Sequence, residues 1–566
     1  MRFAFSGRAG RVTTCTVLAL SAGMLTVSPA VAEPAPRPVL VPPPAATSPV
    51  PTLDVGASAA AFDATAATAG PAPRFDVSGD GKTDLIHRTR NGWTFVAPSS
   101  GGAHVEFTTA DSYLDLDLVP IGDQNGTGGP EVLSLSANGA LRLYADASTA
   151  TGTLRWTGHG WNIYNKVFSP GDVDGDGRAD VMARQYNGDL YLYRATGTVT
   201  APLAGRVKVG SGWGAYDQLV GLGDNDGDGR GDLLARTPSG TVYFYGSTGD
   251  RRAPFRPRKA LASGWQVYNQ ILGVDDRNLD GHADVFARDL NGTLWVHHGR
   301  GNGTFASRKQ TGTAWNGVEQ FGGAGNVPSA GKTLFIARDK AGTLFWYRGL
   351  NNGGLAAREQ VSSIGGYARS NLTLVHALDG GTLPDLLEVY RGRLWNNDKD
   401  LGGGWQIYDR LVGPGDLSGD GKADLLARDT SGVLYLYRGN GAGTGFASRV
   451  RVGGGWGAYD RILGAGDFTG DGRTDVLARD GSGTLFLYRG TGSATAPFAS
   501  RRSIGGGWGT YTLLVAPGDI SGDGRADLLG VNAAGDLYRY LGTGTDTALG
   551  ARVKTGHGFQ TYADLY

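Results

Sequence analysis

Six copies of an acidic nine-residue motif are the residues of this sequence best suited to chemistry. Each copy reads D-x-[D/S/T]-G-D-G-x-x-D, as in the segment from Asp172 to Asp180. Oxygen atoms at alternate positions of a tight loop converge on one point, which suits a hard cation such as Ca²⁺. The glycine at the sixth position permits a sharp turn, and the seventh residue would offer its backbone carbonyl. The motif therefore predicts a calcium site in each copy.

The motif differs from an EF-hand loop in how it would close around the ion. The twelfth position, where an EF-hand has a bidentate glutamate, is Ala183 in the copy that begins at Asp172. The flanking segments have the pattern of strands and not of helices. The ninth-position aspartate must then be the closing ligand. Serine or threonine at the third position lowers the ligand charge in some copies, and with it the expected affinity.

The predicted ligands are the residues at positions one, three, five, seven and nine. In the six regular copies they are Asp76, Ser78, Asp80, Lys82, Asp84; Asp172, Asp174, Asp176, Arg178, Asp180; Asp224, Asp226, Asp228, Arg230, Asp232; Asp416, Ser418, Asp420, Lys422, Asp424; Asp467, Thr469, Asp471, Arg473, Asp475; and Asp519, Ser521, Asp523, Arg525, Asp527. A variant copy with Leu279 in place of glycine supplies Asp276, Asn278, Asp280, His282 and Asp284. The alternative is that Asp-Gly runs only form turns. Six copies at one repeat phase favour the metal site.

A second motif, Gly-Trp-x-x-Tyr, recurs at the same period. Its tryptophans are Trp161, Trp213, Trp265, Trp405, Trp456 and Trp508, and Trp315 keeps only the tryptophan. Sugars stack their C–H groups on aromatic faces, so these tryptophans are candidate ligand-binding residues. The alternative is that they pack in the core, which is the commonest role of tryptophan.

These motifs belong to ten repeats of about fifty residues. The turn glycines of the repeats are Gly92, Gly139, Gly188, Gly240, Gly292, Gly342, Gly392, Gly432, Gly483 and Gly535. Inside a unit, short runs such as Asp424–Arg428 and Val433–Arg438 have the period-two alternation of strands. The period and the strands predict an all-β fold, a β-propeller with ten four-stranded blade repeats.

Ten repeats exceed the usual four to eight blades of one propeller, so they must be partitioned. We favour two five-bladed rings, residues 74–325 with repeats one to five and residues 326–566 with repeats six to ten. Departures from the aromatic segment at Trp315–Phe321 and at Phe559–Tyr566 support this division, because a strand that closes a ring does not lead into another blade. A seven-bladed ring with three extra repeats and one ring of ten are the alternatives.

The first 32 residues have the features of a secretory signal, with Arg2, Arg8 and Arg11 before an apolar core and a small-x-small cleavage site at Ala30–Ala32. Residues 33–73, rich in Pro and Ala, are predicted to be an extended linker. Removing the signal leaves 50 basic and 53 acidic residues, a balance that does not predict nucleic-acid binding. No later segment predicts a membrane span. The expected location is extracellular.

The Asp-rich loops resemble the FG-GAP, or VCBS, repeats of integrin α-chain propellers and their bacterial relatives. This resemblance covers about residues 71–566 and implies a propeller with calcium in a mostly structural role. The Trp-x-x-Tyr phase resembles the tachylectin-type propeller lectins more weakly, since those lack the Asp-rich loops, and implies possible sugar sites between blades.

No catalytic constellation is readable in the sequence. The eight histidines show no metalloprotease spacing, and no glutamate recurs with the repeat. We therefore expect a non-enzymatic binding module, with a glycan or a cell-surface polymer as the ligand. The alternatives are an adhesive propeller that binds a protein partner and a polysaccharide-active enzyme built on one propeller face.

Overall fold

The computed structural model describes residues 51–53, 72–89, 92–110, 112, 115–136, 138–324, 333–381, 383–547 and 549–566. The predicted signal and most of the predicted linker lie outside this part of the chain. No helix within the described residues is long and apolar enough to cross a membrane.

Ten antiparallel sheets make up the described chain, each with four strands apart from one added short strand. The N-terminal set of five sheets contains β2 (Leu85–Thr89), β3 (Thr94–Ala97), β4 (Val105–Glu106), β5 (Asp115–Gly122), β6 (Glu131–Ser136), β7 (Leu141–Ala145), β8 (Thr153–Gly158), β9 (Tyr164–Gly171), β10 (Asp180–Gln185), β11 (Leu190–Tyr193), β12 (Val207–Gly210), β13 (Gln218–Gly223), β14 (Asp232–Arg236), β15 (Val242–Tyr245), β16 (Lys259–Ala262), β17 (Tyr268–Gly273), β18 (Val285–Asp289), β19 (Leu294–His297), β20 (Lys309–Thr313) and β21 (Val318–Phe321).

The C-terminal set of five sheets repeats this order. It contains β22 (Leu334–Asp339), β23 (Leu344–Arg348), β24 (Glu359–Gln360), β25 (Asn371–Val375), β26 (Asp385–Tyr390), β27 (Arg393–Asn396), β28 (Lys399–Gly403), β29 (Tyr408–Gly415), β30 (Asp424–Asp429), β31 (Leu434–Tyr437), β32 (Val450–Gly453), β33 (Tyr459–Gly466), β34 (Asp475–Asp480), β35 (Leu485–Tyr488), β36 (Arg502–Gly505), β37 (Tyr511–Gly518), β38 (Asp527–Asn532), β39 (Leu537–Tyr540), β40 (Val553–Gly556) and β41 (Tyr562–Leu565). The prediction of ten four-stranded antiparallel repeats is confirmed.

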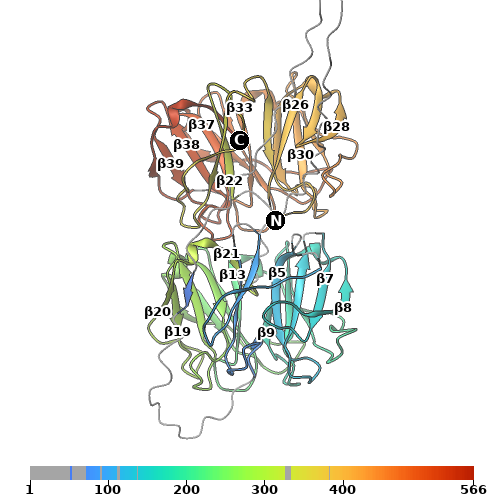
Figure 1. Ribbon diagram of the computed structural model, residues 1–566, viewed down its shortest axis with the longest axis vertical. Helices are drawn as coiled ribbons and strands as arrows, with labels where there is room; N and C mark the ends of the chain where they lie inside the picture. Colours follow the sequence, from blue (N-terminus) through green and yellow to red (C-terminus); the bar gives the residue numbers. More distant parts are fainter. Residues whose placement is uncertain are drawn as a thin grey trace, which may run out of the picture.

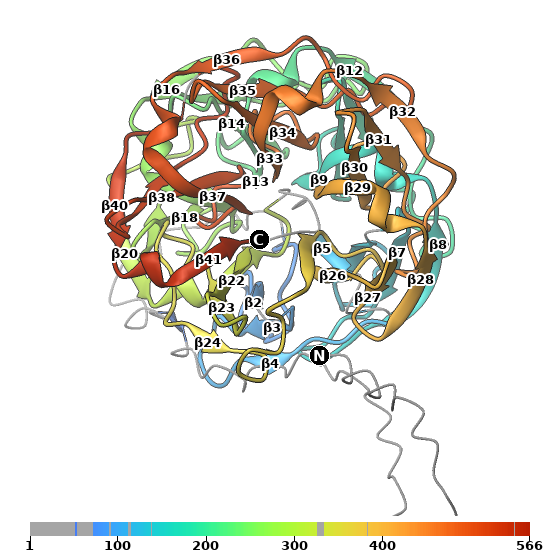
Figure 2. The ribbon, with the colours of Figure 1, turned by 90° about the horizontal axis from the view of Figure 1, so that it is seen from above.

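In each set, one sheet combines strands from the two ends of that set's sequence. In the N-terminal set, β21 pairs with β2, with Phe321 opposite His87. In the C-terminal set, the last strand β41 pairs with β22, with Leu565 opposite Ala337. The two sets are stacked along the long axis of the molecule (Figure 1). Viewed along that axis, strands such as β9 and β33 lie near the centre, while β12 and β36 lie at the periphery (Figure 2).

The aromatic segments form single turns of 3-10 helix between the sheets, which the sequence pattern did not predict. These turns are η1 (Trp161–Ile163), η2 (Trp213–Ala215), η3 (Trp265–Val267), η4 (Trp315–Gly317), η5 (Trp405–Ile407), η6 (Trp456–Ala458), η7 (Trp508–Thr510) and η8 (Phe559–Thr561). Gly160 precedes η1 with a φ of 83°, a left-handed conformation that glycine adopts without strain. The glycine of the Gly-Trp-x-x-Tyr motif is therefore required by the backbone conformation, whereas Ala314 adopts a φ of 63° before Trp315.

A buried arginine at the end of the second strand links each such sheet to the next aromatic turn. In β14, Arg236 is 1% exposed, and its Nη1 donates to the carbonyls of Trp265 at 2.9 Å and Tyr268 at 2.6 Å. Its Nη2 also lies 2.7 Å from a carboxylate oxygen of Asp217. The same two carbonyl bonds are made by Arg184, Arg288, Arg428 and Arg479. We call these residues the turn-binding arginines.

One short piece of the predicted linker belongs to a sheet. β1 (Thr52–Leu53) pairs with β20, with Thr52 opposite Thr313 and Leu53 opposite Gly312. β20 is the outer strand of its sheet, so β1 covers hydrogen-bonding groups at an edge that would otherwise be open. The Pro/Ala-rich composition gave no sign of this pairing.

Replacing a turn-binding arginine should destabilise the sheet junction that it spans. We expect Arg236→Ala to lower the free energy of unfolding by about 3 kcal/mol, because the change breaks a buried ion pair and leaves polar groups without partners. Urea denaturation followed by tryptophan fluorescence measures the change. The exposed Arg251 provides a control, and equal stability of Arg236→Ala and Arg251→Ala would contradict the assigned role.

Candidate functional site: the Asp-rich loops

The first aspartate of each loop organises the turn. Asp172 Oδ1 accepts a hydrogen bond from the backbone N–H of Gly175 at 2.7 Å, and Oδ2 accepts one from Gly177 at 2.7 Å. Both glycines have positive φ, 79° and 86°. The same two bonds recur at Asp76, Asp224, Asp416, Asp467 and Asp519. The fifth aspartate also accepts the N–H of the seventh residue, as Asp176 does from Arg178 at 3.1 Å. The alternative interpretation, that these residues form a turn, is therefore correct for the first and fifth aspartates.

The ninth aspartate is buried and ties the loop to the hairpin that follows it. Asp180 is fully buried, with Oδ2 accepting from the N–H of Val173 at 3.1 Å and Oδ1 from that of Ala195 at 3.0 Å. Asp84, Asp232, Asp424, Asp475 and Asp527 are also buried and accept the corresponding bond from the residue 15 positions later. The carboxylate of the ninth aspartate therefore stabilises the hairpin through hydrogen bonds, and it also belongs to the loop that is the candidate cation site.

The third position carries the oxygens that lack a protein partner. Asp174 Oδ1, Asp226 Oδ1 and Thr469 Oγ1 are buried and have no hydrogen-bond partner within the described residues. A buried polar oxygen without a partner is destabilising, and a bound cation would remove that penalty. In the three loops with serine there, Ser78, Ser418 and Ser521, the hydroxyl lies 3.1 to 3.5 Å from the first aspartate.

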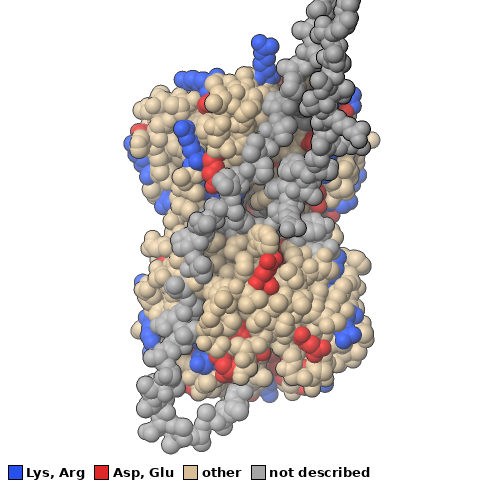
Figure 3. Space-filling view, viewed as in Figure 1, with Lys and Arg blue, Asp and Glu red and all other residues tan. Residues whose placement is uncertain are grey.

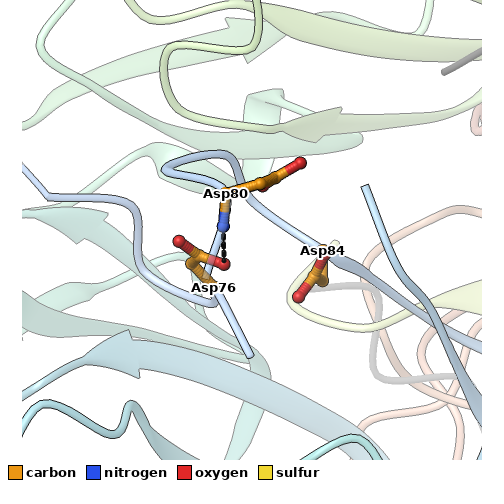
Figure 4. Close-up of side chains that lie close together, drawn as sticks. All are labelled: Asp76, Asp80 and Asp84. Carbon is orange, nitrogen blue, oxygen red and sulfur yellow. Dashed lines mark hydrogen bonds between the residues drawn. The ribbon is translucent and has the colours of Figure 1, made fainter. Parts of the chain in front are cut away.

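Three loops gather carboxylates closely enough to share one ion. The groups are Asp76, Asp80 and Asp84; Asp172, Asp174 and Asp180; and Asp224, Asp226 and Asp232, with one oxygen from each residue within 4.8 Å of the others in its group. Figure 4 shows Asp76 and Asp80 on the turn and Asp84 where the chain enters β2, with the N–H of Asp80 directed at Asp76. An all-oxygen donor set of this kind fits a hard divalent cation.

Burial and like charges raise the pKa of the ninth aspartate. Desolvation is the main cause and raises the pKa of Asp180 to about 7, with Asp174 and Asp172 adding like-charge repulsion. Desolvation likewise raises the pKa of Asp232 to about 8, and that of Asp424 and Asp475 to about 7. Ionised aspartates are therefore unfavourable in these loops unless a positive charge joins them.

Arginines supply part of that positive charge, which the sequence analysis missed. Arg194 lies 3.1 Å from Asp174, and Arg256 lies 3.0 Å from Asp226. Arg525, whose carbonyl was predicted as a ligand, places its guanidinium 2.6 Å from Asp523 of the same loop. The sequence offered one signal for such a residue, because an arginine can directly follow the third strand of a repeat, as Arg194 follows Tyr193.

An irregular loop keeps the turn even where an acid is lost. In the copy that begins at Asp123, with Thr127 at the fifth position, Asp123 Oδ1 accepts from the N–H of Gly126 at 2.7 Å and Oδ2 from that of Gly128 at 2.8 Å. In the variant loop, Asp276 Oδ2 accepts from the N–H of Gly281 at 2.6 Å, and Leu279 adopts a φ of 61° where the regular loops have glycine. Its ninth residue, Asp284, is bonded to His298 Nδ1 at 2.9 Å, a contact that raises the pKa of the histidine. The turn geometry therefore persists in loops that lack some of the acidic residues. Formation of the turn does not require the full set of acids that a cation site would need.

The regular loops of the C-terminal set lie against the N-terminal set. Asn165 Nδ2 donates to the carbonyl of Asp471 at 3.0 Å, and Asn269 Nδ2 donates to that of Ser521 at 2.8 Å. Arg525 also forms an ion pair with Asp217 of the N-terminal set at 3.0 Å, with both side chains at most 8% exposed. These loops therefore form part of the contact between the two sets.

The tryptophans of the aromatic motif are buried between sheets. The side chains of Trp161, Trp213, Trp265, Trp405, Trp456 and Trp508 are 6 to 9% exposed. The ring of Trp161 lies 4.7 Å from that of Tyr193, and the ring of Trp456 lies 4.6 Å from that of Tyr488. This burial matches the packing alternative and leaves little of each indole face accessible to a sugar.

The family comparison identifies repeats of the kind that the loops resemble. The FG-GAP-like repeat family matches residues 172–235, 416–478 and 467–530. Each matched segment begins at the first aspartate of a regular loop. The acidic groups described above are of the type found at calcium sites of such repeats. No curated protein matches the chain.

The solved structures similar to this chain share little sequence with it. The BP39L lectin from Burkholderia pseudomallei is 13% identical, with 78% of this chain and 100% of the lectin covered and a TM-score of 0.24. BBS1N in complex with ARL6DN, soaked with lead, is 10% identical, with 67% and 92% covered and a TM-score of 0.22. Sqt1 from Saccharomyces cerevisiae is 13% identical, with 74% and 94% covered and a TM-score of 0.21.

Proposed function

We propose that this chain, which carries FG-GAP-like repeats, is a secreted, calcium-stabilised binding module whose ligand is a glycan or a cell-surface polymer. The observation that carries the calcium part is the set of buried third-position oxygens without partners, in loops whose other carboxylates converge. The aspartates at positions one, three, five and nine would hold the ion. A bound calcium ion would supply positive charge to the loop and link the turn to the strand that follows it.

We also propose that each set of sheets closes as a five-bladed ring. The support is the pairing of β21 with β2 and of β41 with β22, since each pairing joins the two ends of one set. Closure of this kind removes free sheet edges, which favour aggregation. The partition into seven and three repeats would require β21 to continue into a further sheet.

The charge distribution favours an uncharged ligand. On the face shown in Figure 3, Lys, Arg, Asp and Glu are scattered among uncharged residues, and no single-sign patch covers a set of sheets. A polyanion such as nucleic acid is recognised through a concentrated basic surface. An adhesive propeller that binds a protein and an enzyme acting on polysaccharides remain the rival functions.

Calcium should stabilise the protein most at alkaline pH. The folded-state pKa of Asp180 and Asp232 is about 7 and about 8, above the ordinary aspartate value, so the folded protein binds more protons than the unfolded chain. In a chelator, the stability is therefore lost progressively as the pH rises from about 4, the ordinary aspartate pKa, through about 8, and measurements at about pH 5.5 and about pH 8 both fall within this range. About 1 mM calcium should remove this loss by mass action on the folded state.

Differential scanning calorimetry at both pH values, with chelator and with calcium, measures the effect. Asp176→Ala should weaken the response to calcium by removing one site, while Asp398→Ala, at an exposed aspartate outside the loops, should not. A melting temperature that does not respond to calcium at either pH would contradict metal binding by the loops.

Limited proteolysis should divide the chain between the two sets. We expect cleavage within residues 322–333 to give two fragments that each remain folded, because every sheet is completed within its own set. Mass spectrometry locates the cut, and circular dichroism reports the fold of each fragment. A first cut near residue 400 with loss of structure would support the seven-and-three partition instead.

A glycan array in calcium buffer tests the proposed ligand class. We expect binding to uncharged glycans, with competition by the free sugar and no hydrolysis of the bound glycan. Absence of binding across the array would favour the protein-binding alternative. Turnover of a polysaccharide that one carboxylate substitution abolishes would support the enzyme.

A further inference from the structure

A cavity of about 610 Å³ lies between the two sets of sheets. One wall comes from the N-terminal set, from η1 and from the turns after β6 and β10. The other wall comes from the C-terminal set, from the loop that begins at Asp416 and from the shorter loop that contains Asp379 and Gly380. The volume falls within the range of roughly 300 to 1,000 Å³ typical of sites for small ligands.

Two irregular repeats border this cavity. At the border of the cavity, regular loops reach the N-terminal set, as Asp471 does with Asn165 and Asp420 does with Asn162. In repeat seven the segment from Asp379 to Asp385 is two residues shorter than a regular loop and leaves space. Across the gap, the segment before β5 in repeat two has no tryptophan of the aromatic motif. The shortened loop lies in the lining through Asp379 and Gly380, and Leu116 of β5 also lines the cavity.

Amides, hydroxyls and glycines predominate in the lining. Asn138 and Asn187 contribute from the N-terminal set, and Asn440 and Thr491 from the C-terminal set. The lining also contains acidic residues, Asp379, Asp416 and Asp420, and the cations Lys422 and Arg473. Because both charge signs are present, the lining does not select a strongly charged ligand. Donors and acceptors at this density suit a ligand rich in hydroxyl groups.

Tyr186 gives the cavity an aromatic wall. It lies two residues before the turn glycine of repeat three. Repeat seven has Tyr390 at this position, and six other repeats have small, polar or aliphatic residues there: Pro238, Leu290, Lys340, Thr430, Gly481 and Ala533. Within the described chain, its ring stacks on no other aromatic ring and its hydroxyl has no hydrogen-bond partner. Burial raises the pKa of the Tyr186 hydroxyl, and the carboxylates of Asp416 and Asp467 on the opposite set add to this effect.

We propose that the cavity between the two sets binds a short, uncharged oligosaccharide, with the Tyr186 ring as the surface on which a sugar stacks. The amides of Asn187 and Asn440 would bind hydroxyl groups from opposite walls. The inference rests on the proposed glycan-binding function and assigns its site to the space between the sets, where Trp161 is the one tryptophan of the aromatic motif in the lining. A ligand bound in this cavity would contact both sets, so its affinity would depend on how the two sets are stacked.

Isothermal titration calorimetry on the full chain in calcium buffer tests this proposal. The probes are cellotriose, maltotriose, xylotriose and chitotriose, with trigalacturonate as the charged comparison. For a trisaccharide that binds the wild-type protein, Tyr186→Ala should weaken binding about tenfold or more, as expected for loss of a central aromatic contact. Tyr186→Phe, which keeps the ring, should retain most of the affinity.

Tyr390→Ala is the matched control. Tyr390 lies two residues before the turn glycine Gly392, the same repeat position as Tyr186, but does not line the cavity. It should leave the affinity unchanged. Asn440→Ala, from the opposite wall, should weaken binding, and circular dichroism should confirm that each variant is folded.

The outcomes separate the site from the function. Binding that Tyr186→Ala and Asn440→Ala leave intact would overturn the cavity site while keeping the glycan-binding function. Stronger binding of trigalacturonate than of the uncharged sugars would overturn the ligand class assigned to the cavity. No binding by any probe, together with an empty glycan array, would overturn both proposals.

Discussion

The fold depends on a buried arginine that fastens one sheet to the aromatic turn of the next. In the case of Arg236, a single guanidinium binds two carbonyls of the turn and one carboxylate of its own sheet. The planar fork of arginine donates in several directions at once, which lysine does not. Because the turn also carries a buried tryptophan, the ion pair and the hydrophobic contact reinforce one another at the Arg236 junction. Arg184 and Arg288 bond to Asn165 and Asn269 where Arg236 has an aspartate. Repetition of this unit places successive sheets side by side.

The Asp-rich loops combine a folding role with a proposed cation site in one short motif. The first aspartate forms the turn and the ninth fastens it to the following hairpin, as the bonds of Asp172 and Asp180 illustrate. These contacts use backbone N–H groups, so they survive in loops that have lost other acids. The third-position oxygen has no such structural duty in Asp174 or Asp226. This division explains how a repeat can keep its fold while its capacity for a cation changes.

Stacking of the two sets gives the repeats unequal surroundings. Loops of the C-terminal set contact asparagines of the N-terminal set, and the irregular repeats two and seven border a cavity. In a repeat protein, a site for one ligand requires a local departure from the repeating pattern. The shortened segment from Asp379 and the aromatic Tyr186 are such departures. The interface between the sets is therefore the part of this molecule where a single specific site is best supported.

The sequence by itself determined the repeat, its strands and its acidic loops, because all of these depend on contacts within about fifty residues. Period-two alternation marked β30 and β31, and the spacing of Asp172 to Asp180 marked a tight acidic turn. The tertiary structure alone decided the rest. Burial of Trp161 depends on a neighbouring sheet, the partner of Arg236 lies about thirty residues away in another repeat, and the contact of Arg525 with Asp217 joins residues 308 positions apart. No local pattern encodes such pairings, since they arise only when sheets pack and the two sets stack.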